Sequence, residues 1–208
     1  SVFLFNVHNK LSADCATNKK RLIEGKRVKQ FTEVTVNFDP PQLEAGMLVV
    51  DGLFGSGLNK PLAGGFAAMV KYINQSAAKI VSIDLPSGLM SEDNSYNISA
   101  NIIRADLTLT LQQKKLSMMM ADNQQYLGRI KVLDIRLSPE FIQRTESRCS
   151  ILEEKDIRQL LKPRGDFAHK GSMGTALLIA GSYGMSGASV LATRACLRTG
   201  VGKVITHT

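Results

Sequence analysis

The feature that most constrains this chain is the alternation of short apolar segments with segments of helical periodicity. Apolar residues recur at helical spacing from Leu11 to Ile23, where Gly25 can end a helix, and again from Phe66 to Ile73. Strands are predicted for Val2 to Asn6, Leu48 to Val50, Lys79 to Ile83, Ala105 to Leu111 and Ile130 to Ile135. This order predicts an α/β fold with a mostly parallel sheet and right-handed crossovers.

The composition changes after this first set of elements. Residues 138–150 are polar with scattered charges and one proline, which is typical of a linker. A short helix over 153–161, a strand over 176–180, a helix over 188–199 and a strand that starts at Val204 follow. We therefore expect one domain over residues 1–137, a linker over 138–152, and the beginning of a second α/β domain over 153–208.

Composition excludes several classes of protein. No run of about 18 apolar residues occurs, so a membrane span is not expected. The 3 cysteines are far apart and form no CxxC pair, which favours buried thiols in a cytoplasmic protein over disulfides or zinc. The net charge of +8 favours an anionic partner, either a dinucleotide or a nucleic acid. The densest basic cluster, Lys19 to Lys29, lacks interleaved aromatic residues, so nucleic acid is the less favoured partner.

Two carboxylates directly follow predicted strands. Asp51 comes after Leu48 to Val50, and Asp84 comes after Lys79 to Ile83. Ligands of open α/β sheets bind at the carboxyl ends of the strands, and we expect these two strands to be neighbours. Each aspartate alone could equally be a turn former, because Asp before Gly or Pro is common in turns. Together, each followed by a glycine-bearing loop, they favour a functional site.

The loop after Asp51 is rich in turn-forming residues. Glycines there allow backbone N–H groups to approach an anion, and Lys60 adds a positive charge. The segment Gly55 to Pro61 matches neither the dinucleotide-binding nor the P-loop pattern, so a plain tight connection is the competing interpretation. Ser87, three residues after Asp84, adds a hydroxyl that with carboxylate and carbonyl oxygens suits a hard cation.

A second glycine-rich loop lies in the C-terminal part. Gly181 to Gly187 precedes a predicted helix, whose N-terminus offers free N–H groups and the positive end of a dipole. Small residues at Gly187 and Ala188 would let a ligand lie close to the backbone. Close packing of the helix explains the same residues equally well, and both interpretations stay open here.

Four segments of this chain resemble a known enzyme family. The segment DGLFGSGLNKPL from Asp51 resembles the VDxLFGTGLxRPL signature of NAD(P)H-hydrate epimerases, and SIDLPSGL from Ser82 resembles their D-x-PSGL motif. The segment ADLT from Ala105, with Lys114 and Lys115, is similar to the AD-x-T…K segment of that family. The stretch HKGSMGTALLIAGSYGMSGASVLATRACLRTG from His169 is similar to the start of the ADP- or ATP-dependent NAD(P)H-hydrate dehydratase.

The resemblance implies a Rossmann-like epimerase domain followed by the start of a ribokinase-like dehydratase domain. The first would interconvert the R and S forms of hydrated NADH or NADPH, called NAD(P)HX, and the second would dehydrate the S form with ADP or ATP, together with Mg2+. By position, Asp51 and Ser87 correspond to potassium (K+) ligands, and Asp84 to a substrate contact that we take as the general acid/base. Further substrate contacts would be Gly55, Ser56, Gly57, Leu58, Asn59, Lys60, Pro61 and, in the second domain, Gly187 or Ala188.

The chain also departs from the family pattern. The epimerase family has an NNGGDG-type loop ahead of the first strand seen here, and most dehydratase nucleotide contacts lie beyond Thr208. We therefore expect these 208 residues alone to lack dehydratase activity and to have little or no epimerase activity. We also expect a homo-oligomer. The alternatives are a non-catalytic, RNA-associated scaffold with an epimerase-like fold, and a small-molecule kinase.

Overall fold

The computed structural model describes residues 1–161 and 163–208 and divides the chain into two compact units, Ser1–Cys149 and Ser150–Thr208. The strands of the first unit are β1 (Val2–Phe5), β2 (Phe31–Val34), β3 (Leu48–Asp51), β4 (Lys79–Ile83), β5 (Leu107–Leu111) and β6 (Arg129–Leu133). Its helices are α1 (Ala13–Glu24), α2 (Gly64–Gln75), η1 (Ser99–Asn101), η2 (Leu116–Met119), η3 (Ala121–Asn123), α3 (Gln124–Leu127) and α4 (Pro139–Arg144).

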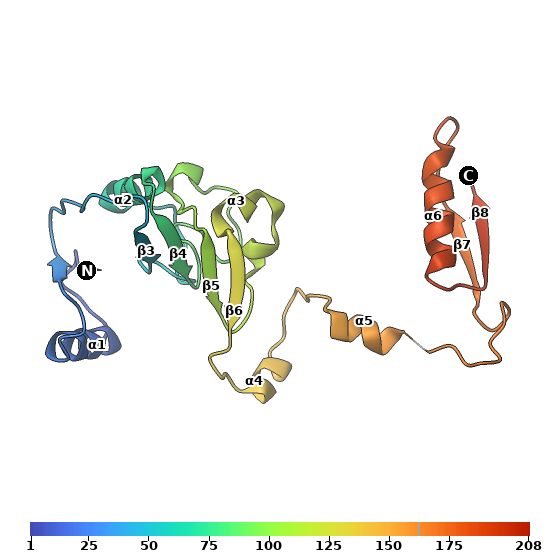
Figure 1. Ribbon diagram of the computed structural model, residues 1–208, viewed down its shortest axis with the longest axis horizontal. Coiled ribbons are helices and arrows are strands. Elements are labelled where there is room, and N and C mark those ends of the chain that lie inside the picture. Colours follow the sequence, from blue (N-terminus) through green and yellow to red (C-terminus); the bar gives the residue numbers. More distant parts are fainter. Residues whose placement is uncertain (162) are drawn as a thin grey trace. The chain divides into compact units, whose positions relative to one another are not determined.

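The centre of the first unit is a four-stranded parallel sheet in the order β3-β4-β5-β6 (Figure 1). Strand order follows chain order, so each strand lies beside the next one in the sequence. The predicted α/β class and parallel sheet are confirmed. The strands that precede Asp51 and Asp84 are direct neighbours, as expected, with Asp51 paired to Ser82 in the register.

Two apolar clusters pack in the first unit. Val70 and Ile73 of α2 pack with Ile80 of β4 in one cluster, which also holds Leu62, Ile103 and Ala105. The second cluster consists of Leu85, Leu89, Ile102, Met118, Tyr126 and Leu127, with Ile130 packed against it. The loops that follow β3 and β4 therefore contribute to the core, because Leu62 and Leu85 belong to them. This packing fixes both loops where they leave the sheet.

The N-terminal strand differs from the prediction. The predicted order of elements places Val2 to Asn6 in the one parallel sheet, but β1 pairs in parallel with β2 in a separate two-stranded sheet and is half-buried. Strand β2 was not predicted, because Phe31–Val34 is short and mixes apolar with polar residues. Aromatic contacts connect this sheet to α2, since the rings of Phe5 and Phe66 have centroids 6.1 Å apart.

The segment predicted as a linker contains a short helix, α4. Ser138 caps this helix by accepting a hydrogen bond from the backbone N–H of Phe141, and Pro139 occupies the first turn. A proline at that position favours a helix start, although the sequence analysis took it as a sign of a loop. No residue of α4 is buried.

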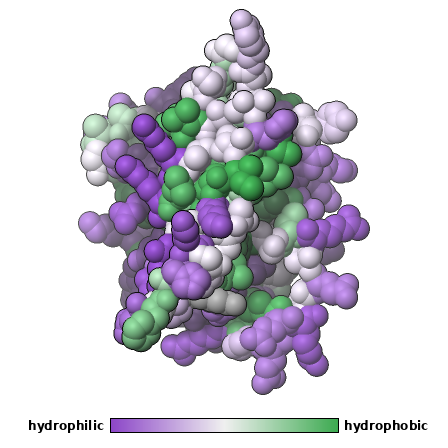
Figure 2. Space-filling model, turned by 90° about the vertical axis from the view of Figure 1, so that its right-hand side faces the viewer, coloured by the Kyte–Doolittle hydropathy of each residue, from purple (hydrophilic) through white to green (hydrophobic). Residues whose placement is uncertain are grey.

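The second unit contains α5 (Glu154–Leu160), β7 (Thr175–Ile179), α6 (Ser186–Arg198) and β8 (Lys203–His207). Strands β7 and β8 are parallel neighbours, and α6 crosses between them, which makes the predicted β-α-β unit (Figure 1). Several apolar side chains of this unit are exposed, including Leu177, Ile179 and Leu191. Figure 2 shows apolar surface among hydrophilic side chains on the face it presents.

Two further findings concern the whole described chain. Cys149 is exposed and Cys15 and Cys196 are half-buried, so the prediction of buried thiols is wrong. These thiols lie on exposed or partly packed helices and loops rather than in either core cluster. Within residues 1–161 and 163–208, no helix has the length and apolar character needed to cross a membrane.

Candidate functional site

The candidate site lies at the carboxyl edge of the four-stranded sheet. Asp51 is the last residue of β3, and Asp84 directly follows β4. Because the two strands are parallel neighbours, both carboxylates lie at the same edge. The loop from Gly52 to Ala63 leaves this edge from β3, and the loop from Leu85 leaves it from β4.

Asp51 is buried and is the centre of a hydrogen-bond network. Asp51 is only 2% exposed, and the neighbouring residues Ser82 and Ser87 are fully buried. Oδ2 accepts from the Ser82 hydroxyl and from the Ser87 backbone N–H, each at 2.8 Å. Oδ1 accepts from the Ser87 hydroxyl at 2.5 Å and, more weakly, from the Leu53 N–H at 3.4 Å. Asp51 thus joins the ends of β3 and β4 and the loop that holds Ser87.

All of the donors around Asp51 are neutral. Among the ion pairs of the described residues, none includes Asp51, although an ionised carboxylate is costly to bury without a positive charge nearby. Beside it, the Ser87 hydroxyl and the carbonyl oxygen of Phe54 lie 3.3 Å apart. Carboxylate, hydroxyl and carbonyl oxygens form the donor set that a hard monovalent cation takes. The donor atoms present therefore fit a potassium ion in charge and in chemistry.

Asp84 has a different environment. Its backbone has φ +67°, a left-handed conformation that is uncommon for a residue with a Cβ. Its Oδ1 atom accepts hydrogen bonds from the ammonium of Lys115, the backbone N–H of Leu111 at 3.1 Å and the hydroxyl of Thr110 at 3.4 Å. The strained backbone is thus held by contacts to the end of β5 and to the loop that follows it.

The surroundings of Asp84 favour its ionised form. Partial burial raises the pKa of the carboxyl group, but hydrogen bonds from Lys115 and Leu111, the charge of Lys115 and the Thr110 hydroxyl outweigh burial. The pKa of Asp84 therefore lies below its ordinary value of 3.8. At neutral pH this side chain is therefore an anion, which can accept a proton or a hydrogen bond.

The glycine loop after β3 approaches Asp84. A Cβ added at Gly55 would lie 3.8 Å from the Oδ2 atom of Asp84, whereas one at Gly57 would meet nothing within 4 Å. Gly55 is half-buried, and the Leu58 N–H donates to the Gly55 carbonyl at 3.2 Å. Of the other predicted contacts in this loop, Ser56, Gly57, Asn59 and Lys60 are exposed, and Leu58 and Pro61 are half-buried. Of these predicted contacts, Gly55 is the residue that the structure places beside the Asp84 carboxylate.

The loop that follows Ser87 is closely packed. Gly88 has φ +97°, and a Cβ there would lie 2.2 Å from the carbonyl oxygen of Asn101, so only glycine fits. The side-chain amide of Asn101 donates to the Leu62 carbonyl at 2.7 Å, which ties this loop to the end of the Gly55 loop. Ser91 makes a longer contact, 3.5 Å, to the Ser56 carbonyl. The two loops are thus connected to each other as well as to the sheet.

Lys115 is a site residue to which the sequence analysis gave no role. It is named in the sequence analysis only as part of a family motif, and its contact with Asp84 depends on the path of the loop after β5, which no periodicity predicts. The side chains of Lys115 and Asp84 are 15% and 13% exposed, so this is the most buried of the ion pairs in the described residues.

The two remaining predicted substrate contacts, Gly187 and Ala188, belong to the second unit. Gly187 and Ala188 lie in the first turn of α6 and are exposed, and a Cβ at Gly187 would meet nothing within 4 Å. Ser189 of this helix is buried. A Cβ added at Gly181 would lie 3.2 Å from both the Cβ and the hydroxyl oxygen of Ser189. Close packing therefore occurs at Gly181, and Gly187 faces open space.

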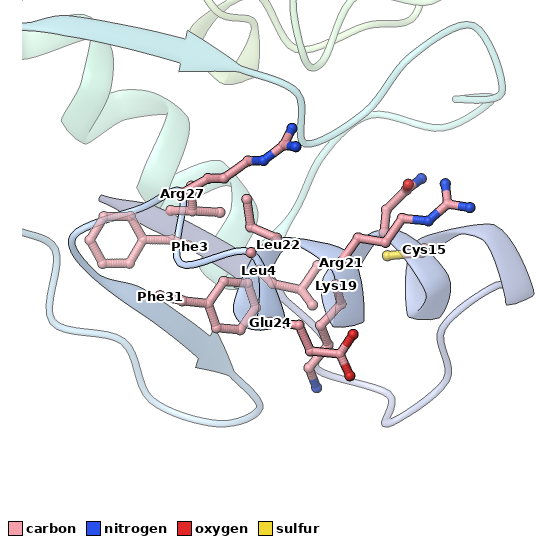
Figure 3. Close-up of a pocket in the computed structure, with 12 residues that line it drawn as sticks. Phe3, Leu4, Cys15, Lys19, Arg21, Leu22, Glu24, Arg27 and Phe31 are labelled. Atoms are coloured by element: carbon pink, nitrogen blue, oxygen red, sulfur yellow. The ribbon is translucent and has the colours of Figure 1, made fainter.

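An open groove of about 910 Å³ lies elsewhere in the first unit, between β1, α1 and β2. Figure 3 shows its apolar side chains, among them Phe3, Leu22 and Phe31, with Arg21 and Arg27 beside them. None of the residues predicted for the site lines this groove. The candidate site is defined by hydrogen bonds and loop geometry at the sheet edge.

The parallel sheet and its strand-end carboxylates define an α/β protein of Rossmann-like type. Residues 1–117 match the model of a family described as YjeF-related protein N-terminus, and the chain belongs to this family. The match includes Asp51, Asp84, Ser87 and Lys115.

Curated relatives extend the match into the second unit. Proteins named bifunctional NAD(P)H-hydrate repair enzyme Nnr are 33% identical over 171 residues in Coxiella burnetii and 31% identical over 202 residues in Thermofilum pendens. These alignments cover 82% and 97% of this chain, but 35% and 37% of the relatives. A third relative of the same name, from Dictyoglomus turgidum, is 31% identical over 186 residues. The chain thus spans about a third of the length of these relatives.

Proposed function

We propose that the chain is part of a bifunctional enzyme that repairs hydrated nicotinamide dinucleotides. Residues 1–137 would belong to an epimerase domain for R and S NAD(P)HX, residues 138–152 to a linker, and residues 153–208 to an ADP- or ATP-dependent dehydratase domain. The names of the relatives support this assignment, since they are repair enzymes for NAD(P)H hydrates.

The arrangement of Asp51 and Asp84 at one sheet edge is the observation that carries the epimerase proposal. One carboxylate is buried among neutral donors, and the other presents an oxygen beside a glycine loop. A plain turn would need neither the network of Ser82 and Ser87 nor the buried ion pair of Asp84. The two aspartates thus have separate roles, one in holding the loops and one in contacting the ligand.

Asp84 is our candidate for the general acid/base. Epimerisation at a carbon that bears a hydroxyl group and the ring nitrogen requires a proton to leave and to return, whether the ring opens or water is lost and added back. An ionised Asp84 can accept that proton on Oδ2 and give it back to the product. The backbone N–H groups of the exposed loop residues Ser56, Gly57 and Asn59, with Lys60, would bind the phosphates.

Asp51 and Ser87 would hold a potassium ion, with the Phe54 carbonyl as a further oxygen. When bound, the ion would supply positive charge that offsets the buried carboxylate and the substrate phosphates. In the described residues no cluster of three His, Cys, Asp or Glu side chains forms a metal centre, so the ion would depend on hydroxyl and carbonyl oxygens.

In the second unit the proposed contacts lie in the first turn of α6. Gly187 and Ala188 would contact the hydrated dinucleotide, and ADP or ATP with Mg2+ would serve the dehydratase reaction. The first turn of α6 carries no carboxylate that could hold Mg2+, so the residues there do not fit a nucleotide–metal complex by themselves.

Binding of hydrated NADH to the 208-residue chain, measured by titration calorimetry, tests the epimerase proposal. We expect saturable binding in potassium chloride, weaker binding when choline replaces potassium, and a loss of at least about tenfold in Asp51→Asn. Asp39, which is exposed, provides the control Asp39→Asn. Equal affinity in both salts and in Asp51→Asn would reject the assigned site.

RNA binding is the competing function. The exposed basic residues on and after α1, such as Lys20, Arg21 and Lys26, favour it. A filter-binding titration with single-stranded RNA across a range of salt concentrations separates the two functions. Tight, salt-dependent binding of RNA without binding of hydrated NADH would replace the enzyme proposal by the scaffold alternative.

A further inference from the structure

We propose that Lys115 is a positioning residue that fixes one oxygen of Asp84 and thereby presents the other, Oδ2, to the ligand at the Gly55 loop. Naming that ligand as a hydrated nicotinamide dinucleotide rests on the proposed function. The positioning itself rests only on contacts within the first unit.

The ammonium group of Lys115 has no hydrogen left for a ligand. It donates to Asp84 Oδ1, to the Thr110 hydroxyl at 3.0 Å, to the Leu111 carbonyl at 3.0 Å and to the Gln113 carbonyl at 3.3 Å. An ammonium has three N–H groups, and here four acceptors surround it. Lys115 therefore acts through Asp84 and does not itself contact the substrate.

The two carboxylate oxygens of Asp84 differ in their hydrogen bonds. Lys115, Leu111 and Thr110 all donate to Oδ1, and in the described residues no hydrogen bond reaches Oδ2. Oδ2 lies on the side of Gly55, where the missing Cβ leaves room beside it. A fixed carboxylate with one free oxygen is oriented before the ligand arrives, which lowers the cost of ordering it on binding.

A purely structural ion pair is the competing explanation. Lys115 does connect the loop after β5 to the end of β4, and that alone would stabilise the unit. Lys115 is the one charged side chain that contacts Asp84 in the described residues, and Asp51, the other carboxylate of this edge, bonds to Ser82 and Ser87 instead. A structural role predicts lost stability only, whereas positioning also predicts a changed carboxylate and changed binding.

The first measurement follows the carboxyl carbon of Asp84 by 13C NMR as a function of pH. In Lys115→Gln we expect the titration midpoint to rise by about one pH unit or more, because the amide keeps hydrogen-bonding capacity but removes the charge. Lys115→Arg should keep a low midpoint. An unchanged midpoint in Lys115→Gln would overturn the proposal. If Lys115→Gln does not fold, the titration of Lys115→Arg and the binding of the glycine variants below still test the proposal.

The second measurement tests the free oxygen through a matched pair of glycine variants. Gly55→Ala places a methyl group in contact with Oδ2 without a clash, whereas Gly65→Ala, in the first turn of α2, meets open space outside the site. We expect Gly55→Ala to weaken binding of hydrated NADH about tenfold with an unchanged Asp84 titration, and Gly65→Ala to bind like the wild type. Equal binding by the two variants would overturn the proposal. A wild-type chain that shows the expected titration but binds no dinucleotide would refute the proposed function and leave the role of Lys115 in place.

Discussion

The loop after β3 and the loop after β7 both follow a parallel strand, contain glycines and lead to a helix, but they differ in what surrounds them. Strand β3 ends in a carboxylate, Asp51, that collects donors from β4 and from the Ser87 loop. Strand β7 ends in Ile179, and the loop from Gly181 to Gly187 is exposed. Both loops contain glycines, so the feature that distinguishes the first loop is the strand-end carboxylate with its partners from other segments.

The largest expected change in stability distinguishes two glycines that both have positive φ, Gly88 and Gly184. Gly88→Ala should cost about 4 kcal/mol of unfolding free energy, because the new Cβ would overlap the Asn101 carbonyl in addition to the left-handed strain. Gly184→Ala in the second loop should cost only about 1 kcal/mol, since its Cβ would meet nothing within 4 Å. Urea unfolding of both variants checks this. Equal losses would show that the two loops are packed alike.

Removal of the central carboxylate should have the next largest effect. Asp51→Ala leaves the buried donors of Ser82 and Ser87 without an acceptor, and we expect a loss of about 3 kcal/mol. Tyr126 is buried in the first unit, so tyrosine fluorescence during urea unfolding reports on it. Asp39→Ala is the exposed control and should change the free energy by less than about 0.5 kcal/mol. Similar losses in both variants would contradict the network.

The pH dependence of stability tests Asp84. Because its pKa in the folded chain lies below 3.8, its ionised form adds stability that is complete above the ordinary carboxyl range and is lost as the pH falls through the folded pKa. The difference in unfolding free energy between the wild type and Asp84→Asn should therefore be constant at neutral pH and shrink below about pH 4. A difference that grows on acidification would show that the pKa is raised instead.

The smallest effect is expected in the second loop. Gly187 lies in the first turn of α6, so Gly187→Ala should change stability by no more than about 0.5 kcal/mol, in the stabilising direction. Thermal unfolding checks this prediction. A large loss would mean that Gly187 is as closely packed as Gly88, which would remove the contrast between the two loops.

The sequence predicted those parts of the fold that depend on periodicity. Apolar runs placed β3 to β6, and the rule that neighbouring parallel strands share an edge brought Asp51 and Asp84 together. Strand β2 was missed because four residues of mixed polarity carry no clear alternation. Helix α4 was missed because the proline that starts it also occurs in loops.

The chemistry of the site was predicted only in part. The aspartates and Ser87 could be named from motifs, but not that Ser87, 36 residues after Asp51, donates to it with both its hydroxyl and its backbone N–H. The pairing of Lys115 with Asp84 likewise depends on the path of the loop after β5. Hydrogen bonds between residues that are distant in the sequence depend on tertiary packing, which local sequence patterns do not predict.

The central claim is that the carboxyl edge of the four-stranded sheet binds the hydrated dinucleotide. The most direct test is an NMR titration of the isotope-labelled chain with hydrated NADH in potassium chloride. We expect the resonances of the backbone amides of Gly55, Gly57 and Leu58 and of the carboxyl carbon of Asp84 to shift together, with a single affinity. Shifts confined to the groove around Phe3 and Leu22, with the edge residues unchanged, would contradict it.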